Sequence, residues 1–323
     1  LEKAFAYGIA PETESGTIPE TVFIMFQMTF AIITAVLFAF SAVFNTRITK
    51  LLDEVTANFY RLLAACIILG VITLGFYPGS FHREASIWLM ISGVVGFGVG
   101  DIALFAAFAR IGSRLTILIN FSLSAIVGAF ADWVLLNDPI GLWQWASVLM
   151  ILCGLSLALL TPGSRERMHG SFKLGIVAAT IAGIGQGIGA TISRHAESIA
   201  ESSGITINGL SQAFQRVSAG LMCLFVLWAW KRFRGTIPRP NTNRAQISIW
   251  VLTAALFGPV LGVSCFQQSL KTMTSGEAMA VTATSPLLLI PLAYFFEGDK
   301  IRPLALLGAI TGVSGVIMMA LLR

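Results

Sequence analysis

Residues 62–81 read LLAACIILGVITLGFYPGSF, twenty consecutive positions without a charged side chain. A helix needs about 20 apolar residues to cross a bilayer, because each residue adds about 1.5 Å along its axis. The stretch lacks the period-2 alternation of a membrane β-barrel strand and is about twice as long as one. It therefore predicts a membrane-spanning helix.

The composition of the whole chain agrees with this. Of its 323 residues, 56% are hydrophobic and only 11% are charged, whereas soluble domains carry about 25% charged residues. The polar residues are too few to cover a soluble core, so lipid is the expected solvent. The net charge of +5 does not indicate nucleic-acid binding, because Lys and Arg fall between apolar runs, as membrane insertion requires.

Stretches without charge divide the chain into ten predicted spans. Two of them hold a single charge, Asp101 in one and Arg216 in the other. The predicted fold class is therefore an all-α integral membrane protein with ten transmembrane helices. The predicted spans are residues 22–46, 62–81, 85–109, 115–131, 139–164, 174–193, 202–230, 245–270, 278–296 and 303–322.

Lys and Arg in the connections predict the orientation. Connections after odd-numbered spans hold 14 of the 21, and the other connections and termini hold 5; Arg61 and Arg216 are the remaining two. Positive residues concentrate on the cytoplasmic side. The bias predicts cytoplasmic odd connections and external termini, in a cell membrane that we expect to be a bacterial inner membrane.

The second half of the chain repeats the first at an offset of 161 residues. Residues 97–160 align without a gap, and Phe105 meets Phe266. A slightly different offset matches Arg61 with Arg216, each early in the second helix of its half. Five helices are an odd number, so the copies must cross the membrane in opposite directions. This predicts the inverted repeats of secondary transporters, with a substrate site near the midplane.

Three segments carry a family resemblance: NFYRLLAA at 58–65, GDIALFAAF at 100–108 and LND at 136–138. From about residue 35 to 323 the chain resembles the EamA-like branch of the drug/metabolite transporter superfamily, although many relatives carry Gly-Glu where this chain has Asn137-Asp138. The resemblance implies ten helices in two inverted repeats around a central cavity. It implies no particular substrate, because relatives export amino acids, drugs and other metabolites.

The N-terminal stretch differs. Residues 6–34 resemble part of an ammonium transporter, and we interpret the join as a chimeric junction inside the first span. An ammonium channel needs two intramembrane histidines, but His82, His169 and His195 all fall in loops or at helix ends, which disfavours that function. The predicted organisation is an extension without a functional role (1–21), a first repeat (22–162) and a second repeat (172–323).

Asp101 is the sharpest candidate residue. A carboxylate inside a span costs roughly 2.5–3.5 kcal/mol to insert and normally faces a cavity or a partner. It therefore serves as a proton-coupling or substrate-amine site, or as a structural partner of Arg61 or Arg216, or it lies at a helix end near the membrane interface. Arg61 is predicted to snorkel to the head groups, while Arg216 lies deeper. Either guanidinium suits a substrate carboxylate, but their equivalent positions favour a shared structural role.

The remaining substrate or coupling candidates are uncharged: Asn120, Gln186, Gln267 and Ser285. For most of them an interhelical hydrogen bond is the expected role. The glycines at 183, 185, 187 and 189 around Gln186 predict a bend or close packing. Pro259 and Pro286 predict kinks that open a cavity.

No motif indicates an enzyme, a metal site or a cofactor. The four cysteines lie in apolar runs and are predicted to be small core residues. The expected partners are a small-molecule substrate and the lipid bilayer, without nucleic acid, and a homodimer is left open. The sequence thus predicts a secondary transporter that exports small metabolites, such as amino acids, by alternating access. The alternative is a non-transporting membrane scaffold.

Overall fold

The computed structural model describes residues 20–159, 171–237, 244–285, 287 and 303–321, and all regular elements in these residues are helical. Seven stretches are long and apolar enough to span a membrane, and Leu142–Leu157 and Leu306–Met319 are shorter apolar helices. The protein is therefore a multi-pass membrane protein. More than half of the predicted span 278–296 lies outside the described residues, so the total of ten stays a prediction.

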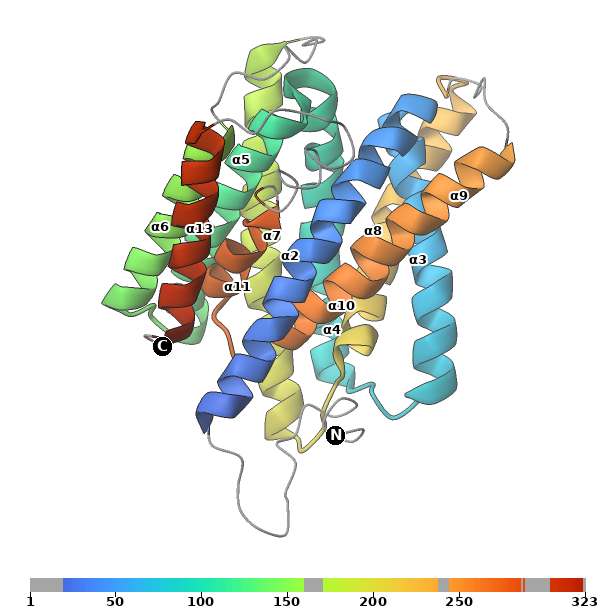
Figure 1. Ribbon diagram of the computed structural model, residues 1–323. Coiled ribbons are helices and arrows are strands. Elements are labelled where there is room, and N and C mark those ends of the chain that lie inside the picture. Colours follow the sequence, from blue (N-terminus) through green and yellow to red (C-terminus); the bar gives the residue numbers. More distant parts are fainter. Residues whose placement is uncertain (1–19, 160–170, 238–243, 286, 288–302, 322–323) are drawn as a thin grey trace.

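The helical segments of the first half run from blue to green in Figure 1, and those of the second half run from yellow-green to red. Those of the first half are α2 (Glu20–Leu51), α3 (Glu54–Phe76), α4 (Arg83–Gly93), η1 (Val94–Gly100), α5 (Asp101–Leu136) and α6 (Leu142–Leu159). Those of the second half are α7 (Phe172–Ser202), α8 (Gly209–Phe233), α9 (Arg244–Ala255), η2 (Leu256–Val260), α10 (Leu261–Ser269), α11 (Ser275–Thr282) and α13 (Pro303–Leu321).

Three predicted span boundaries differ from the helix ends by seven or more residues. Helix α3 begins at Glu54 instead of residue 62, α8 begins at Gly209 instead of residue 202, and α7 ends at Ser202 instead of residue 193. The side chains of Asp53 and Asn208 each accept a hydrogen bond from a backbone N–H in the first turn of the helix that follows. Helix ends are set by such caps, whereas a charge-free run shows only where a span is tolerated.

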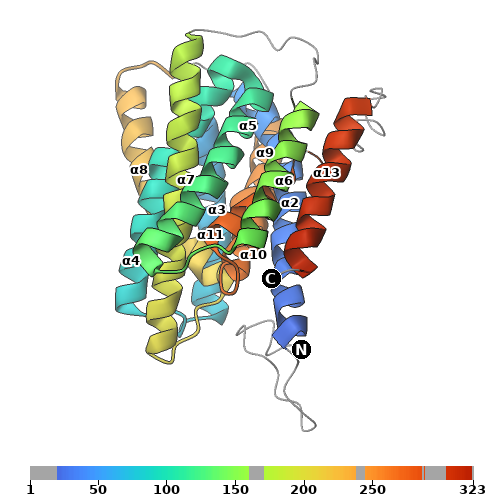
Figure 2. The same cartoon turned by 90° about the vertical axis from the view of Figure 1, so that its left-hand side faces the viewer.

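Helices α4 and η1 and the start of α5 cross the molecule once, and the remainder of α5 crosses it again (Figures 1 and 2). Glycines of α7 lie beside both passes and show their directions. The neighbouring pairs are Gly189 with Gly96, Gly185 with Gly100, Gly183 with Asn120, and Gly187 with Ser124. The first pass is thus antiparallel to α7 and the second parallel, so the chain reverses between residues 100 and 120. This agrees with the separate spans predicted at 85–109 and 115–131.

The second helices of the two halves run in opposite directions. Helices α3 and α8, the second of each half, pack side by side. We call the end of the molecule that carries the Lys- and Arg-rich connections the basic end. There, Lys231, in the last turn of α8, pairs with Asp53, which caps the start of α3, at 2.8 Å. At the opposite end, Asn208 before α8 donates to Ser80 after α3 at 3.4 Å. Equivalent helices of inverted repeats must be antiparallel in this way.

The halves also share a local distortion. A shift of 161 residues places the π-helical segment η1 over η2, and each interrupts the third helix of its half. Pro259 lies in η2 and explains the loss of regular α-helical bonding there; η1 is rich in glycine instead. Pro286, the other proline predicted to bend a helix, lies outside the described residues. Such π turns often occur at functional sites.

Helices α6 and α13, the fifth helix of each half, touch through glycine and lie together at one side of the molecule (Figure 1). A Cβ placed on Gly154 would lie 2.4 Å from the backbone nitrogen of Gly312. On the other helix, a Cβ on Gly315 would lie 3.0 Å from the backbone nitrogen of Ile151. The two backbones therefore approach as closely as only glycine permits.

We expect Gly154→Ala to lower the free energy of unfolding by about 1–3 kcal/mol, because the added methyl group must push α13 away. Gly75→Ala is the matched control, since a Cβ there would have no neighbour within 4 Å. The control should gain about 0.5–1 kcal/mol, because alanine favours helix more than glycine does. Denaturant unfolding in detergent measures both variants, and equal effects would contradict the close approach.

Candidate functional site: a central polar cavity

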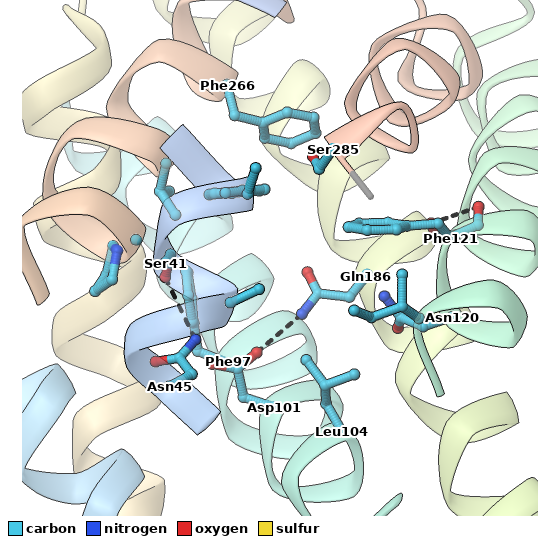
Figure 3. Close-up of a pocket in the computed structure, with 18 of the residues that line it drawn as sticks. Ser41, Asn45, Phe97, Asp101, Leu104, Asn120, Phe121, Gln186, Phe266 and Ser285 are labelled. Carbon is cyan, nitrogen blue, oxygen red and sulfur yellow. Dashed lines mark hydrogen bonds between the residues drawn. The ribbon is translucent and has the colours of Figure 1, made fainter. Parts of the chain in front are cut away.

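A cavity of about 140 Å³ lies between the two halves. Its walls come from α2, α3, η1 and α5 of the first half, and from α7, α8, η2, α10 and α11 of the second. The volume has room for about five waters at roughly 30 Å³ each, and a cavity of about this size can hold a benzene ring, which is the scale of a small metabolite. Figure 3 shows Gln186 reaching toward Asp101, with Ser41 and Asn45 on the facing helix α2.

The structure brings six of the seven predicted candidates to this cavity. They are Arg61, Asp101, Asn120, Gln186, Arg216 and Ser285. The seventh, Gln267, is fully buried and lies behind Arg216, to which it is hydrogen-bonded. Of the two prolines predicted to shape a cavity, Pro259 lies in its wall.

Asp101 forms a buried ion pair with Arg61. The carboxylate begins α5 directly after η1, and Arg61 lies two turns into α3. Arg61 Nη2 donates to Asp101 Oδ2 at 2.5 Å and to Asn58 Oδ1 at 2.8 Å. Gln186 Nε2 donates to the other oxygen, Oδ1, at 3.1 Å (Figure 3). Both carboxylate oxygens are therefore occupied, as a buried anion requires.

The prediction that Arg61 snorkels to the head groups is wrong. Its relative exposure is only 6%, and it stacks over the ring of Phe105 at 5.1 Å. Because α3 starts at Glu54, Arg61 lies deeper in the helix than the predicted span suggested. The carboxylate that holds it there follows 40 residues later in the chain.

Arg216 is the more buried arginine, with 2% exposure. Its Nη1 donates to Gln267 Oε1 at 2.6 Å, and its guanidinium lies 5.4 Å from the ring centre of Phe97. A Cβ on Gly93 would lie 2.1 Å from the backbone oxygen of Arg216, so α4 and α8 touch here through backbone. Within the described residues, Arg216 forms no salt bridge.

The two arginines are placed reciprocally. A Cβ on Gly258, in η2, would lie 3.8 Å from Arg61 Nη1. A Cβ on Gly96, in η1, would lie 3.1 Å from Arg216 Nη2. Each half thus extends its arginine to the π segment of the other half. This exchange follows from the antiparallel pairing of α3 and α8.

A series of polar contacts runs from Arg216 toward the end of the molecule opposite the basic end. Gln267 Nε2 donates to Gln212 Oε1 at 3.1 Å, and Gln212 Nε2 donates to Glu197. Glu197 Oε1 in turn pairs with Lys271 Nζ at 2.7 Å. We did not predict Glu197 or Lys271 as site residues, because both follow a predicted span and resemble ordinary loop charges in sequence.

A second polar cluster, centred on the buried carboxylate of Asp132, joins the two halves at the end of the molecule opposite the basic end. Arg194, on α7, donates to Asp132 Oδ2 at 2.7 Å and to Asp138 Oδ2 at 2.8 Å. Ser275, the first residue of α11, donates its backbone N–H to Asp132 Oδ2 at 2.5 Å and its hydroxyl to Oδ1 at 2.9 Å. Asp132 is fully buried. Its carboxylate therefore links α5 of the first half to α7 and α11 of the second.

Sequence reasoning also missed the aromatic lining of the cavity. These residues are Phe38, Phe97, Phe108, Phe121 and Phe266. With 23 phenylalanines in the chain, nothing local separates a cavity residue from a lipid-facing one. Only Phe266 carried a signal, through its match with Phe105 in the repeat.

Comparison with known proteins identifies the family. The EamA-like transporter family matches residues 25–160 and again residues 173–321, and no curated protein matches the chain. The resemblance of residues 6–34 to ammonium transporters stays a hypothesis. A solved structure described only as a crystal structure of a protein has a TM-score of 0.73 and 13% sequence identity, covering 92% of this chain and 97% of that one. That similarity shows the fold alone.

Proposed function

Because the chain belongs to the EamA-like transporter family, we propose that it is a secondary transporter that moves small metabolites by alternating access to the central cavity. The proposal includes ten spans, export as the direction, and amino acids or related compounds as substrates. The observation that carries it is the cavity itself, a polar site that both halves enclose at their interface. A scaffold would not require buried charges there.

The two ends of the molecule differ in a way that suits alternating access. The cavity extends toward the basic end, since Asn45, Phe108 and Ile117 line it within about two turns of that end. At the other end of the molecule, the carboxylate of Asp132 links α5 of the first half to α7 and α11 of the second. Alternating access then requires this cluster to separate while the basic end closes, as one half moves against the other.

Transport by purified protein in liposomes tests the proposal. A thermal-shift screen against amino acids, nucleosides and cationic drugs first selects a ligand, and counterflow of that ligand is then measured. Asn120→Trp fills the cavity and should abolish counterflow. Ile67→Trp, at a position with 59% exposure on the outer surface of α3, introduces the same side chain elsewhere and should leave it intact. Undiminished counterflow in a folded Asn120→Trp variant would exclude this cavity as the pathway.

A further inference from the structure

The formal charges of the residues that line the cavity do not sum to zero. Within the described residues they are two guanidiniums, Arg61 and Arg216, and one carboxylate, Asp101, all at most 6% exposed. The carboxylate contacts Arg61 directly and attracts Arg216 only from a greater distance. One positive charge is therefore left over in the cavity, and it lies on Arg216.

Arginine has no way to remove this charge itself. A buried lysine or histidine releases its proton, but a guanidinium stays protonated in proteins. The partners of Arg216 are the neutral amide of Gln267 and the ring of Phe97, and its Nε has no hydrogen-bond partner within the described residues. A buried ion held in this way is stabilised when an anion enters beside it.

Glycines of η1 and α7 pack directly against the guanidinium. A Cβ on Gly96 would lie 3.1 Å from Arg216 Nη2, and one on Gly189 would lie 3.4 Å from it. Side chains at these two positions would crowd the nitrogen that Gln267 leaves unused. Arg216 lines the cavity, and Gln267 occupies only its Nη1. The Nη2 group is therefore left as a donor, and a planar fork of this kind suits a carboxylate.

The remainder of the cavity selects for an apolar body. Five phenylalanines contribute to its walls, and aromatic faces favour apolar and ring-containing groups. No second carboxylate within the described lining residues accompanies Asp101, which already binds Arg61. A substrate ammonium group would thus lack an anionic partner, unlike a substrate carboxylate.

We propose that the cavity binds small organic monoanions, with the substrate carboxylate on Arg216 and its apolar body against the phenylalanines. This rests on the proposed transport function and narrows its substrate class from metabolites in general, zwitterionic amino acids included, to carboxylates that carry a net negative charge. Gln267 holds the guanidinium in position from behind.

Four probes of similar shape test the charge requirement on purified protein: 3-phenylpropionate, 3-phenylpropionamide, phenylalanine and 2-phenylethylamine. The expected result is that 3-phenylpropionate raises Tm most and binds tightest. Stronger binding of the amide, the zwitterion or the amine would overturn the proposal, as would the absence of binding by all four.

Variants at the guanidinium test the site. Arg216→Gln should weaken 3-phenylpropionate binding roughly ten- to a hundredfold, the fold-change expected when a charge-assisted hydrogen-bond pair is lost. Arg216→Lys keeps the charge without the fork and should fall between. Arg234→Gln removes an exposed arginine of the basic end and is the matched control. Equal binding by the Arg216→Gln and control variants would overturn the proposal.

Gln267→Glu keeps the test decisive if the Arg216 variants fail to fold. The substitution turns the amide that accepts from Arg216 Nη1 into a carboxylate. The new Glu side chain then neutralises Arg216 in place of the substrate carboxylate. The folded variant should lose the Tm shift with 3-phenylpropionate, and a retained shift would count against Arg216 as the binding group. Liposome counterflow separates the two proposals: Arg216-dependent binding without transport refutes the transporter function alone, and transport of only neutral or cationic compounds refutes the anion site alone.

Discussion

Asp101→Asn is expected to lower the free energy of unfolding by about 3–5 kcal/mol, because it leaves the buried guanidinium of Arg61 without its carboxylate. The substituted amide keeps the shape of the side chain but raises the excess positive charge of the cavity from one to two. Gln186, which donates to Asp101 Oδ1, would then bind a weaker acceptor. Denaturant unfolding of the purified variant measures the loss.

The double variant Asp101→Asn/Arg61→Gln separates pairing from every other role of the carboxylate. Removing both charges together should recover most of the lost stability, since a neutral pair needs no compensation. If this stable double variant lacks the pH-dependent transport that the parent shows, Asp101 also couples protons. If the double variant transports like the parent, the carboxylate serves only the ion pair. A single variant as stable as the parent would contradict the pairing itself.

Asp132→Asn is expected to lower the free energy of unfolding by about 2–3 kcal/mol and to open the opposite end. The fully buried carboxylate accepts from Arg194 and twice from Ser275, and hydrogen bonds to a charged group contribute about 1.5–3 kcal/mol. Because these bonds join the two halves, their loss favours the conformation in which this end has separated. Labelling of an introduced cysteine, Ser285→Cys, by a membrane-impermeant thiol reagent should increase.

Asp138→Asn is the matched control for this experiment. It removes the second carboxylate that contacts Arg194, but the Asp138 side chain is 44% exposed. Exposed ion pairs contribute at most about 1 kcal/mol, so both stability and cysteine labelling should stay near the parent values. Similar labelling in the two variants would show that Asp132 does not hold this end shut.

The membrane spans, the repeat and most of the site candidates were accessible from the sequence. Insertion into lipid depends on the local density of apolar residues. This density can be calculated from the sequence without any knowledge of tertiary contacts. Ionisable and amide residues inside such runs are rare enough to attract notice, which is why Asp101, Arg216 and Gln186 were found. The cavity-lining phenylalanines, such as Phe38 and Phe121, were not found, because phenylalanine also suits a lipid-facing position.

The amino-acid sequence by itself thus determined the membrane class, the approximate spans and the family of this protein. Only the tertiary structure decided that Arg61 rather than Arg216 forms the ion pair with Asp101, and that Asp132 links the two halves. The physical reason is that insertion is a sum over neighbouring residues, whereas an ion pair depends on distances of 2.5–2.7 Å between atoms on different helices. Those distances follow from helix packing, which no local stretch of the chain contains.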